Sequence, residues 1–138
     1  MDCFTPLRMT LCGVAGSGKS TLINTLVTAI RKITQKANSV YVCGPTGSAA
    51  FNAGGETCHQ LFNIQARLYD SGLSAQALKT LMSKLENTIA LIVDERSMVP
   101  ALLLGTMEAY CRQAAFKGKN NHLSWGGLPI VILVGDNY

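Results

Sequence analysis

Residues 13–20, GVAGSGKS, fit the pattern G-x-x-x-x-G-K-[ST]. Residues 7–13 place apolar side chains at alternate positions, which predicts a β-strand before the motif. The residues after it predict a helix whose apolar stripe consists of Leu22, Leu26, Ile30 and Ile33. Glycines let a backbone close around phosphate oxygens, with its N–H groups turned inward at the positive end of a helix. This unit therefore predicts a phosphate-binding loop, and the alternative is a glycine-rich turn that binds nothing.

Two side chains of this loop are expected to have chemical roles. The ammonium group of Lys19 is expected to reach the β- and γ-phosphates of a nucleotide. The hydroxyl of Ser20 is expected to bind Mg²⁺, a metal that prefers oxygen ligands. The predicted nucleotide-binding residues are Gly13, Val14, Ala15, Gly16, Ser17, Gly18, Lys19, Ser20 and Thr21.

Two adjacent acids follow a second apolar run, in LIVDERSM at residues 91–98. Asp94 is placed to hold the magnesium shell, and Glu95 is the candidate base that orients an attacking water. We therefore predict Lys19, Asp94 and Glu95 as catalytic residues, and Ser20 and Asp94 as metal ligands. A water-activating carboxylate favours hydrolysis over phosphate transfer, and no guanine-reading N-K-x-D motif occurs in the sequence, so ATP is the expected nucleotide. The alternative is that both acids only cap a helix or lie on the surface.

The rest of the chain alternates predicted strands with predicted helices. Further strands are expected at 39–44, 88–94 and 129–135, and helices at about 48–52, 59–65, 75–86 (with Ser74 as N-cap) and 99–116, followed by a polar loop at 117–127. This alternation predicts right-handed βαβ units and an α/β fold with a mostly parallel sheet.

The composition indicates one compact domain. The chain has 138 residues, of which 48% are hydrophobic and 14% charged, and a net charge of +4 that would suit a polyanionic partner. No apolar run approaches the ~18 residues of a membrane span, so we expect a soluble, intracellular protein without a membrane partner. The five cysteines include no C-x-x-C pair, which fits reduced thiols. Cys12 and Cys43 are expected to be small core residues.

A second glycine-rich stretch, GPTGSAAFNAGGETCHQLF, occupies residues 44–62. Together with residues 13–20, IVDERSM at 92–98 and WGGLPIVILVGDNY at 125–138, it resembles in order and spacing the ATPase half of the Pif-type DNA helicases of superfamily one, including helitron relatives. The resemblance implies a RecA-like P-loop NTPase domain with three α/β/α layers. Arg96 and Trp125 differ from the residues that the family usually has at these positions.

The resemblance also implies a function. In that family, ATP hydrolysis with Mg²⁺ drives 5′-to-3′ movement along single-stranded DNA in repair and recombination. The resemblance makes Pro45, Thr46, Gly47, Thr57 and His59 candidate DNA contacts, since amides, hydroxyls and a helix N-terminus can hold DNA phosphates without reading sequence. The alternative is a tight turn followed by close helix packing, with His59 as a cap or a core residue. Phe51 and Phe62 are expected in the core.

The family pattern continues beyond these residues. It includes a glutamine that senses the γ-phosphate and a second RecA-like domain that supplies an arginine finger. The 138 residues are therefore expected to be a single domain, the first of two motor domains, and to hydrolyse ATP weakly when isolated. Such a helicase is expected in the nucleus or a mitochondrion of a eukaryote, or in the cytoplasm of a bacterium. Two alternatives stay open: a P-loop NTPase that does not act on DNA, and a nucleotide-binding fragment without turnover.

Overall fold

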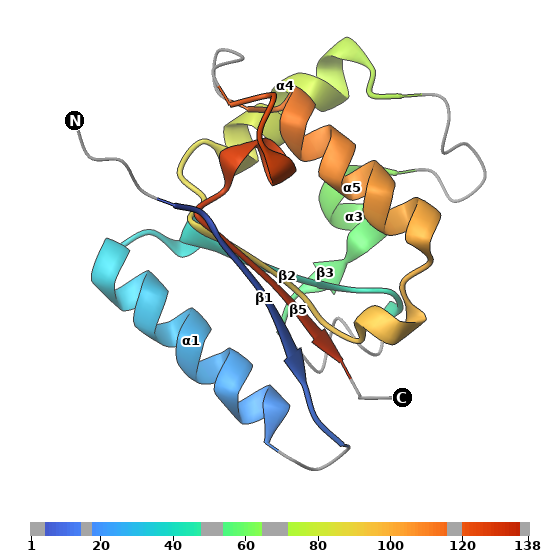
Figure 1. Ribbon diagram of the computed structural model, residues 1–138. Helices are drawn as coiled ribbons and strands as arrows, with labels where there is room; N and C mark the ends of the chain where they lie inside the picture. Colours follow the sequence, from blue (N-terminus) through green and yellow to red (C-terminus); the bar gives the residue numbers. More distant parts are fainter. Residues whose placement is uncertain (1–4, 15–17, 48–53, 65–71, 116–119, 136–138) are drawn as a thin grey trace.

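A parallel β-sheet forms the centre of the fold (Figure 1). The computed structural model of the chain describes residues 5–14, 18–47, 54–64, 72–115 and 120–135. Five strands pair in the order β1-β5-β4-β2-β3, and each pairing is parallel. The strands are β1 (Leu7–Cys12), β2 (Val40–Gly44), β3 (Glu56–Thr57), β4 (Ala90–Val93) and β5 (Ile130–Gly135).

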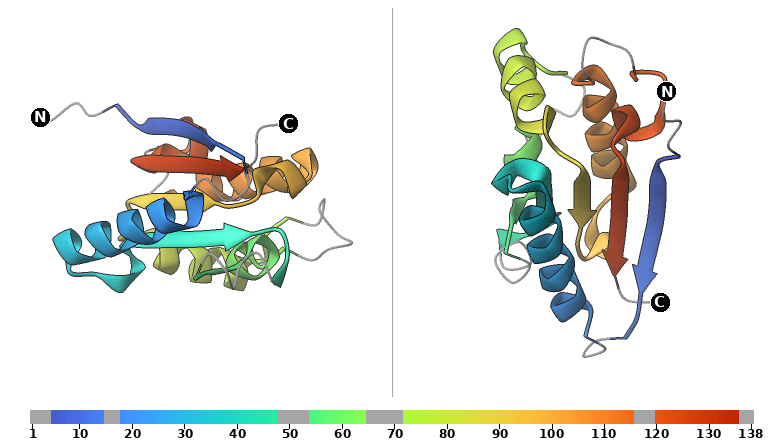
Figure 2. Two further views of the ribbon diagram at one scale, coloured as in Figure 1. Left: turned by 90° about the horizontal axis from the view of Figure 1, so that it is seen from below. Right: turned by 90° about the vertical axis from the view of Figure 1, so that its left-hand side faces the viewer.

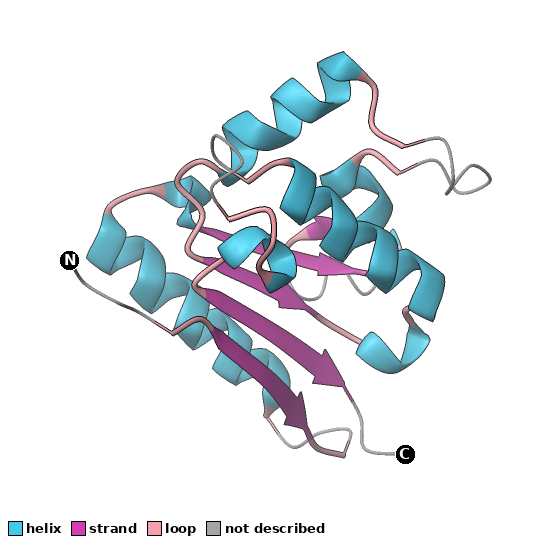
Figure 3. Ribbon diagram, turned by 45° about the horizontal axis from the view of Figure 1, so that its top comes forward, coloured by secondary structure: helices cyan, strands magenta, loops and turns pink. Residues whose placement is uncertain are grey.

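Helices cover both faces of this sheet (Figure 2). One face carries α1 (Lys19–Thr34), and the other carries α3 (Cys58–Phe62), α4 (Ala75–Leu85) and α5 (Ala101–Gln113). Short 3-10 turns lie at Ala37–Ser39, Arg96–Met98 and Ser124–Gly127. The predicted α/β/α layering is confirmed, and Figure 3 shows the strands running in one direction between the helices. None of the described helices combines the length and apolar character that a bilayer crossing requires.

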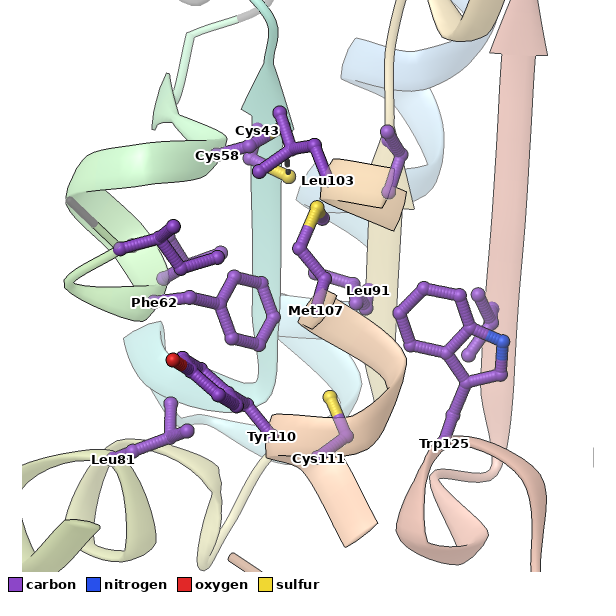
Figure 4. Close-up of a cluster of buried hydrophobic side chains, with 14 of the residues drawn as sticks. Cys43, Cys58, Phe62, Leu81, Leu91, Leu103, Met107, Tyr110, Cys111 and Trp125 are labelled. Carbon is purple, nitrogen blue, oxygen red and sulfur yellow. Dashed lines mark hydrogen bonds between the residues drawn. The ribbon is translucent and has the colours of Figure 1, made fainter. Parts of the chain in front are cut away.

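The strand residues alternate between two hydrophobic cores. Val42 and Ile92 pack with Ile23 on the side of α1. Cys43 and Leu91 belong to the core under α3, α4 and α5, which Figure 4 shows in close-up. Successive side chains of a strand point to opposite faces. The uninterrupted apolar runs of the central strands therefore reflect burial on both sides.

The buried face of α1 differs from the predicted stripe. Ile23 is buried, and Leu26, Val27 and Ile30 pack against the same core. Leu22 and Ile33, which were predicted on that face, are 42% and 81% exposed. At about 100° per residue, Leu22 and Ile33 lie on one side of the line through Leu26 and Ile30, and Ile23 and Val27 lie on the other side. The sheet covers the side of Ile23 and Val27.

The edge position of β1 explains a second difference. Cys12 was expected in the core, but it is exposed, because β1 pairs only with β5 among the described strands. Cys43 is buried as predicted, because β2 lies between β4 and β3. An apolar alternating pattern thus predicts a strand without saying how deeply it is buried.

The helices on the opposite face begin close to the predicted positions. The hydroxyl of Ser74 accepts the N–H of Ala77 at 3.1 Å and caps α4 as predicted. The helix expected from residue 99 begins at Ala101, with Pro100 as its N-cap. Phe62 is buried as expected. The helix predicted at about 48–52, which includes Phe51, lies outside the described residues.

A left-handed turn precedes β5, where only a polar loop was predicted. Trp125 has a φ of 54° and is 9% exposed in the larger core. A Cβ on Gly126 would lie 2.3 Å from the carbonyl oxygen of Cys111, so this close approach requires glycine. Arg8 of β1 ties the turn to the sheet, since its guanidinium donates to the carbonyl oxygens of Ser124 at 2.8 Å and of Leu128 at 2.7 Å.

Candidate active site

The predicted functional residues lie at the carboxyl edge of the sheet. β1 and β5 end side by side at Cys12 and Gly135, and β4 and β2 run beside them in the same direction. The loop of residues 13–20 follows β1, the acidic pair 94–95 follows β4, and the segment 44–59 follows β2. Ligands of parallel α/β sheets bind at this edge. Because the strands run parallel, the three predicted motifs all start at this one edge.

Lys19 contacts the beginning of the phosphate loop. Its Nζ donates hydrogen bonds to the carbonyl oxygens of Gly13 and Val14, each at 2.8 Å. Gly18, the N-cap of α1, has a φ of 90° and provides no side-chain cap. A helix start without a side-chain cap is suited to bind an anion through its N–H groups. Three predicted members of the loop, Ala15, Gly16 and Ser17, lie outside the described residues.

Ser20 and Thr21 follow in the first turn of α1. Both residues are exposed on the helix that begins at the loop. The carbonyl oxygen of Thr21 accepts the hydroxyl of Thr25 at 2.9 Å, which is a bond within the helix. The hydroxyl of Ser20 is an oxygen ligand of the type that Mg²⁺ prefers.

The acidic pair forms a tight turn after β4. The N–H of Asp94 donates to the carbonyl oxygen of Cys43 at 2.8 Å, which ties the turn to β2. Oδ1 of Asp94 accepts the N–H of Glu95 at 2.8 Å. A carboxylate has several acceptor sites, so this bond leaves Asp94 able to bind a metal. Glu95 is exposed and has a φ of 50°, a left-handed conformation that costs a non-glycine residue about 1–3 kcal/mol and is frequent at functional sites.

Arg96 crosses the same edge, a position that the sequence did not reveal. A Cβ on Gly135 would lie 3.0 Å from Cγ of Arg96, so the stem of this side chain covers the end of β5. Its Nη2 lies 3.7 Å from Sγ of Cys12 at the end of β1. A positive charge from the turn after β4 thereby reaches the strand that leads into the phosphate loop. Local sequence patterns did not reveal this contact, because it depends on the strand order.

The glycines of the second segment have a structural role. Gly54 has a φ of 72°, and a Cβ on Gly55 would lie 1.9 Å from the carbonyl oxygen of Val42. Only a glycine lets the chain pass this close to β2 and then pair with it as β3. At the end of β2, Pro45 is half-buried, and Thr46 and Gly47 are exposed.

Thr57 and His59 belong to the start of α3. Thr57 is the N-cap in a capping box: its hydroxyl accepts the N–H of Gln60 at 3.1 Å, and Oε1 of Gln60 accepts the N–H of Thr57 at 3.0 Å. His59 is half-buried, and its carbonyl oxygen accepts the N–H of Ile64 at 2.9 Å. Thr57, not His59, therefore caps this helix.

Two buried thiols lie beneath this segment. A hydrogen bond joins Sγ of Cys58 to Sγ of Cys43 at 3.4 Å. This bond, together with burial, raises the pKa of the Cys43 thiol well above its usual range, whereas the same bond lowers the pKa of Cys58. The described cysteines, all free thiols, are Cys12, Cys43, Cys58 and Cys111.

The chain is similar to helicases in sequence and in fold. The family of PIF1-like helicases matches residues 5–138. The ATP-dependent DNA helicase Pif1 of Bdellovibrio bacteriovorus is 36% identical over an alignment of 131 residues, and the match covers 91% of this chain and 27% of that relative. The Pif1 helicase of Bacteroides in complex with ADP-AlF3 and ssDNA has a TM-score of 0.68 at 33% identity, over 94% of this chain and 28% of that one.

A eukaryotic structure agrees with these relatives. The Pif1 helicase of Candida albicans has a TM-score of 0.72 at 28% identity, and the match covers 94% of this chain and 29% of that one. The chain thus spans less than a third of the length of the helicases that it matches.

Proposed function

This chain belongs to the PIF1-like helicase family, and we propose that it is the first RecA-like motor domain of an ATP-dependent DNA helicase. The observation that carries the proposal is the shared carboxyl edge, where the loop after β1, the acidic turn after β4 and the segment after β2 lie together. In the full-length protein, hydrolysis at this edge would be coupled to 5′-to-3′ movement on single-stranded DNA, with a second RecA-like domain closing over the nucleotide.

The phosphate loop is proposed to bind the triphosphate of ATP. Lys19 already bonds to the carbonyl oxygens of Gly13 and Val14, which holds its ammonium group beside the first residues after β1. Phosphate oxygens are stronger acceptors for this group than carbonyl oxygens, because they carry charge. The N–H groups after Gly18 would bind the same phosphates at the positive end of α1.

The donor set fits magnesium. Ser20 offers a hydroxyl and Asp94 a carboxylate, and both are the hard oxygen ligands that Mg²⁺ takes alongside phosphate oxygens. When bound, the ion would neutralise charge on the phosphates. Glu95, exposed beside Asp94, is the group proposed to orient the attacking water and accept its proton.

Single-stranded DNA is proposed to lie along the segment after β2. Thr46 and Gly47 are exposed at the end of this strand and can meet a phosphate backbone through a hydroxyl and N–H groups. The hydroxyl of Thr57 accepts a bond of the capping box, so its first contribution is to order the start of α3. Pro45 and His59 would complete the contact surface. A nuclear or mitochondrial location in a eukaryote, or a cytoplasmic one in a bacterium, goes with this function.

Three measurements test the proposal. The 138-residue chain should bind ATP in isothermal titration and a labelled thymidine oligonucleotide in fluorescence anisotropy at a stated salt concentration. In the full-length protein that carries this chain, single-stranded DNA should stimulate ATP hydrolysis. A folded chain that binds ATP, within a full-length protein whose hydrolysis ignores DNA, would favour an ATPase that does not act on DNA.

A further inference from the structure

Two thiols face each other at the base of the glycine-rich segment. Sγ of Cys43, in β2, and Sγ of Cys58, the first residue of α3, are 3.4 Å apart (Figure 4), and both residues are fully buried. The parallel pairing of Cys43 with Glu56 fixes the backbone around them. A disulfide needs about 2.05 Å between sulfurs. The sulfurs must therefore approach by only about 1.4 Å to form the bond.

We propose that Cys43 and Cys58 form a redox site that closes to an intramolecular disulfide on reaction with a peroxide. One thiol sulfur attacks a peroxide oxygen and breaks the O–O bond, which yields a sulfenic acid and water. The second thiol sulfur then displaces the hydroxyl group as water and forms the S–S bond. In total the two thiols lose two electrons and two protons, and hydrogen peroxide is reduced to two water molecules.

A small oxidant can reach this pair through a local opening. β3 is the edge strand of the described sheet and pairs with β2 over two residues only, and α3, which carries Cys58, has five residues. Local openings can cost less free energy than global unfolding, and the opening proposed here would release Leu61 and Phe62 of α3 from the core. Cys111, by contrast, is buried within the 13 residues of α5.

The disulfide would close a ring around the segment after β2. Cys43 and Cys58 are 15 positions apart, and the ring contains Thr46, Gly47 and Thr57. Closing such a ring restricts the unfolded chain and stabilises the folded one. The importance of this ring for DNA rests on the proposed function, whereas the formation of the disulfide does not.

Peptide mapping tests the site directly. The 138-residue chain is treated with hydrogen peroxide, alkylated under denaturing conditions, digested without reduction and analysed by mass spectrometry. We expect a linked peptide pair that contains Cys43 and Cys58, has lost two hydrogens and separates on reduction. The melting temperature should rise by roughly 5–10 °C on oxidation. If both thiols are still alkylated when the exposed Cys12 is oxidised, the proposal is wrong.

Variants separate this pair from the other thiols. Cys12→Ser should still form the linked pair, whereas Cys43→Ala and Cys58→Ala should each abolish it and the rise in melting temperature. Because the wild-type map is decisive by itself, a variant that fails to fold does not weaken the test. A linked pair in a chain that binds no DNA would support the redox site and contradict the proposed function. DNA binding without a linked pair would support the proposed function and contradict the redox site.

Discussion

Lys19 donates two hydrogen bonds to the carbonyl oxygens of Gly13 and Val14, so its charge lies at the end of β1 before a phosphate binds. Charged hydrogen bonds contribute about 1.5–3 kcal/mol each. We therefore expect Lys19→Ala to weaken ATP binding by about 10–100-fold in isothermal titration of the chain. Lys32→Ala, in the last turn of the same helix, is the matched control and should leave the affinity unchanged. An equal loss in both variants would mean that overall charge, not position, governs binding.

A substitution of Glu95 can separate ATP binding from ATP hydrolysis. Glu95→Gln keeps the shape of the side chain and removes the group that accepts a proton. We expect ATP affinity within about twofold of wild type, because the backbone bonds of the turn do not involve this carboxylate. Hydrolysis by the full-length protein should fall by about 10²-fold or more, the scale of general-base catalysis. Loss of ATP binding in this variant would show that Glu95 has a structural role.

At the scale of elements, replacing either of two glycines with alanine should change the free energy of unfolding in opposite directions. A methyl group on Gly55 would lie 1.9 Å from the Val42 carbonyl oxygen, so Gly55→Ala must displace β3 from β2. We expect a loss of about 1–3 kcal/mol in the free energy of unfolding, as for overpacked sites. Gly105→Ala is the control: it lies within α5 with open space around it, and alanine favours a helix by about 0.5–1 kcal/mol. Urea denaturation measures the free energy of unfolding of both variants: we expect it to fall for Gly55→Ala and to rise for Gly105→Ala.

The segment between β2 and α3 has a separate prediction for DNA. Thr46→Ala removes an exposed hydroxyl at the end of β2, and we expect single-strand affinity to fall by about 3–10-fold, the cost of about one hydrogen bond. Thr106→Ala, on α5, should have no effect. Thr57→Ser should also retain affinity, because serine keeps the capping box. Anisotropy titrations at one salt concentration compare the three. Equal binding by Thr46→Ala and wild type would leave this segment as a turn that only packs.

At the scale of the whole molecule, the sequence predicted the helices and strands better than it predicted which of them lie side by side. The strand–loop–helix unit and the parallel sheet follow from local patterns. The strand order does not, because pairing between distant segments leaves no local signal. The exposure of Cys12 and the reach of Arg96 across Gly135 both depend on that order. The buried turn at Trp125 was missed because its residues resemble a polar loop.

The small share of a helicase that this chain covers leads to a prediction for its rate of ATP hydrolysis in isolation. It matches 27% of the Bdellovibrio relative, and we propose that the rest of the full-length protein supplies the second domain and the arginine finger that the resemblance implies. Arginine fingers accelerate phosphoryl transfer by about 10³–10⁵-fold, equivalent to ~4–7 kcal/mol of barrier. The isolated chain should therefore bind ATP with measurable affinity but hydrolyse it at least about 10³-fold more slowly than the full-length protein. Titration and phosphate release, measured on both proteins, decide this. Similar rates would mean that the catalytic groups of one sheet edge suffice.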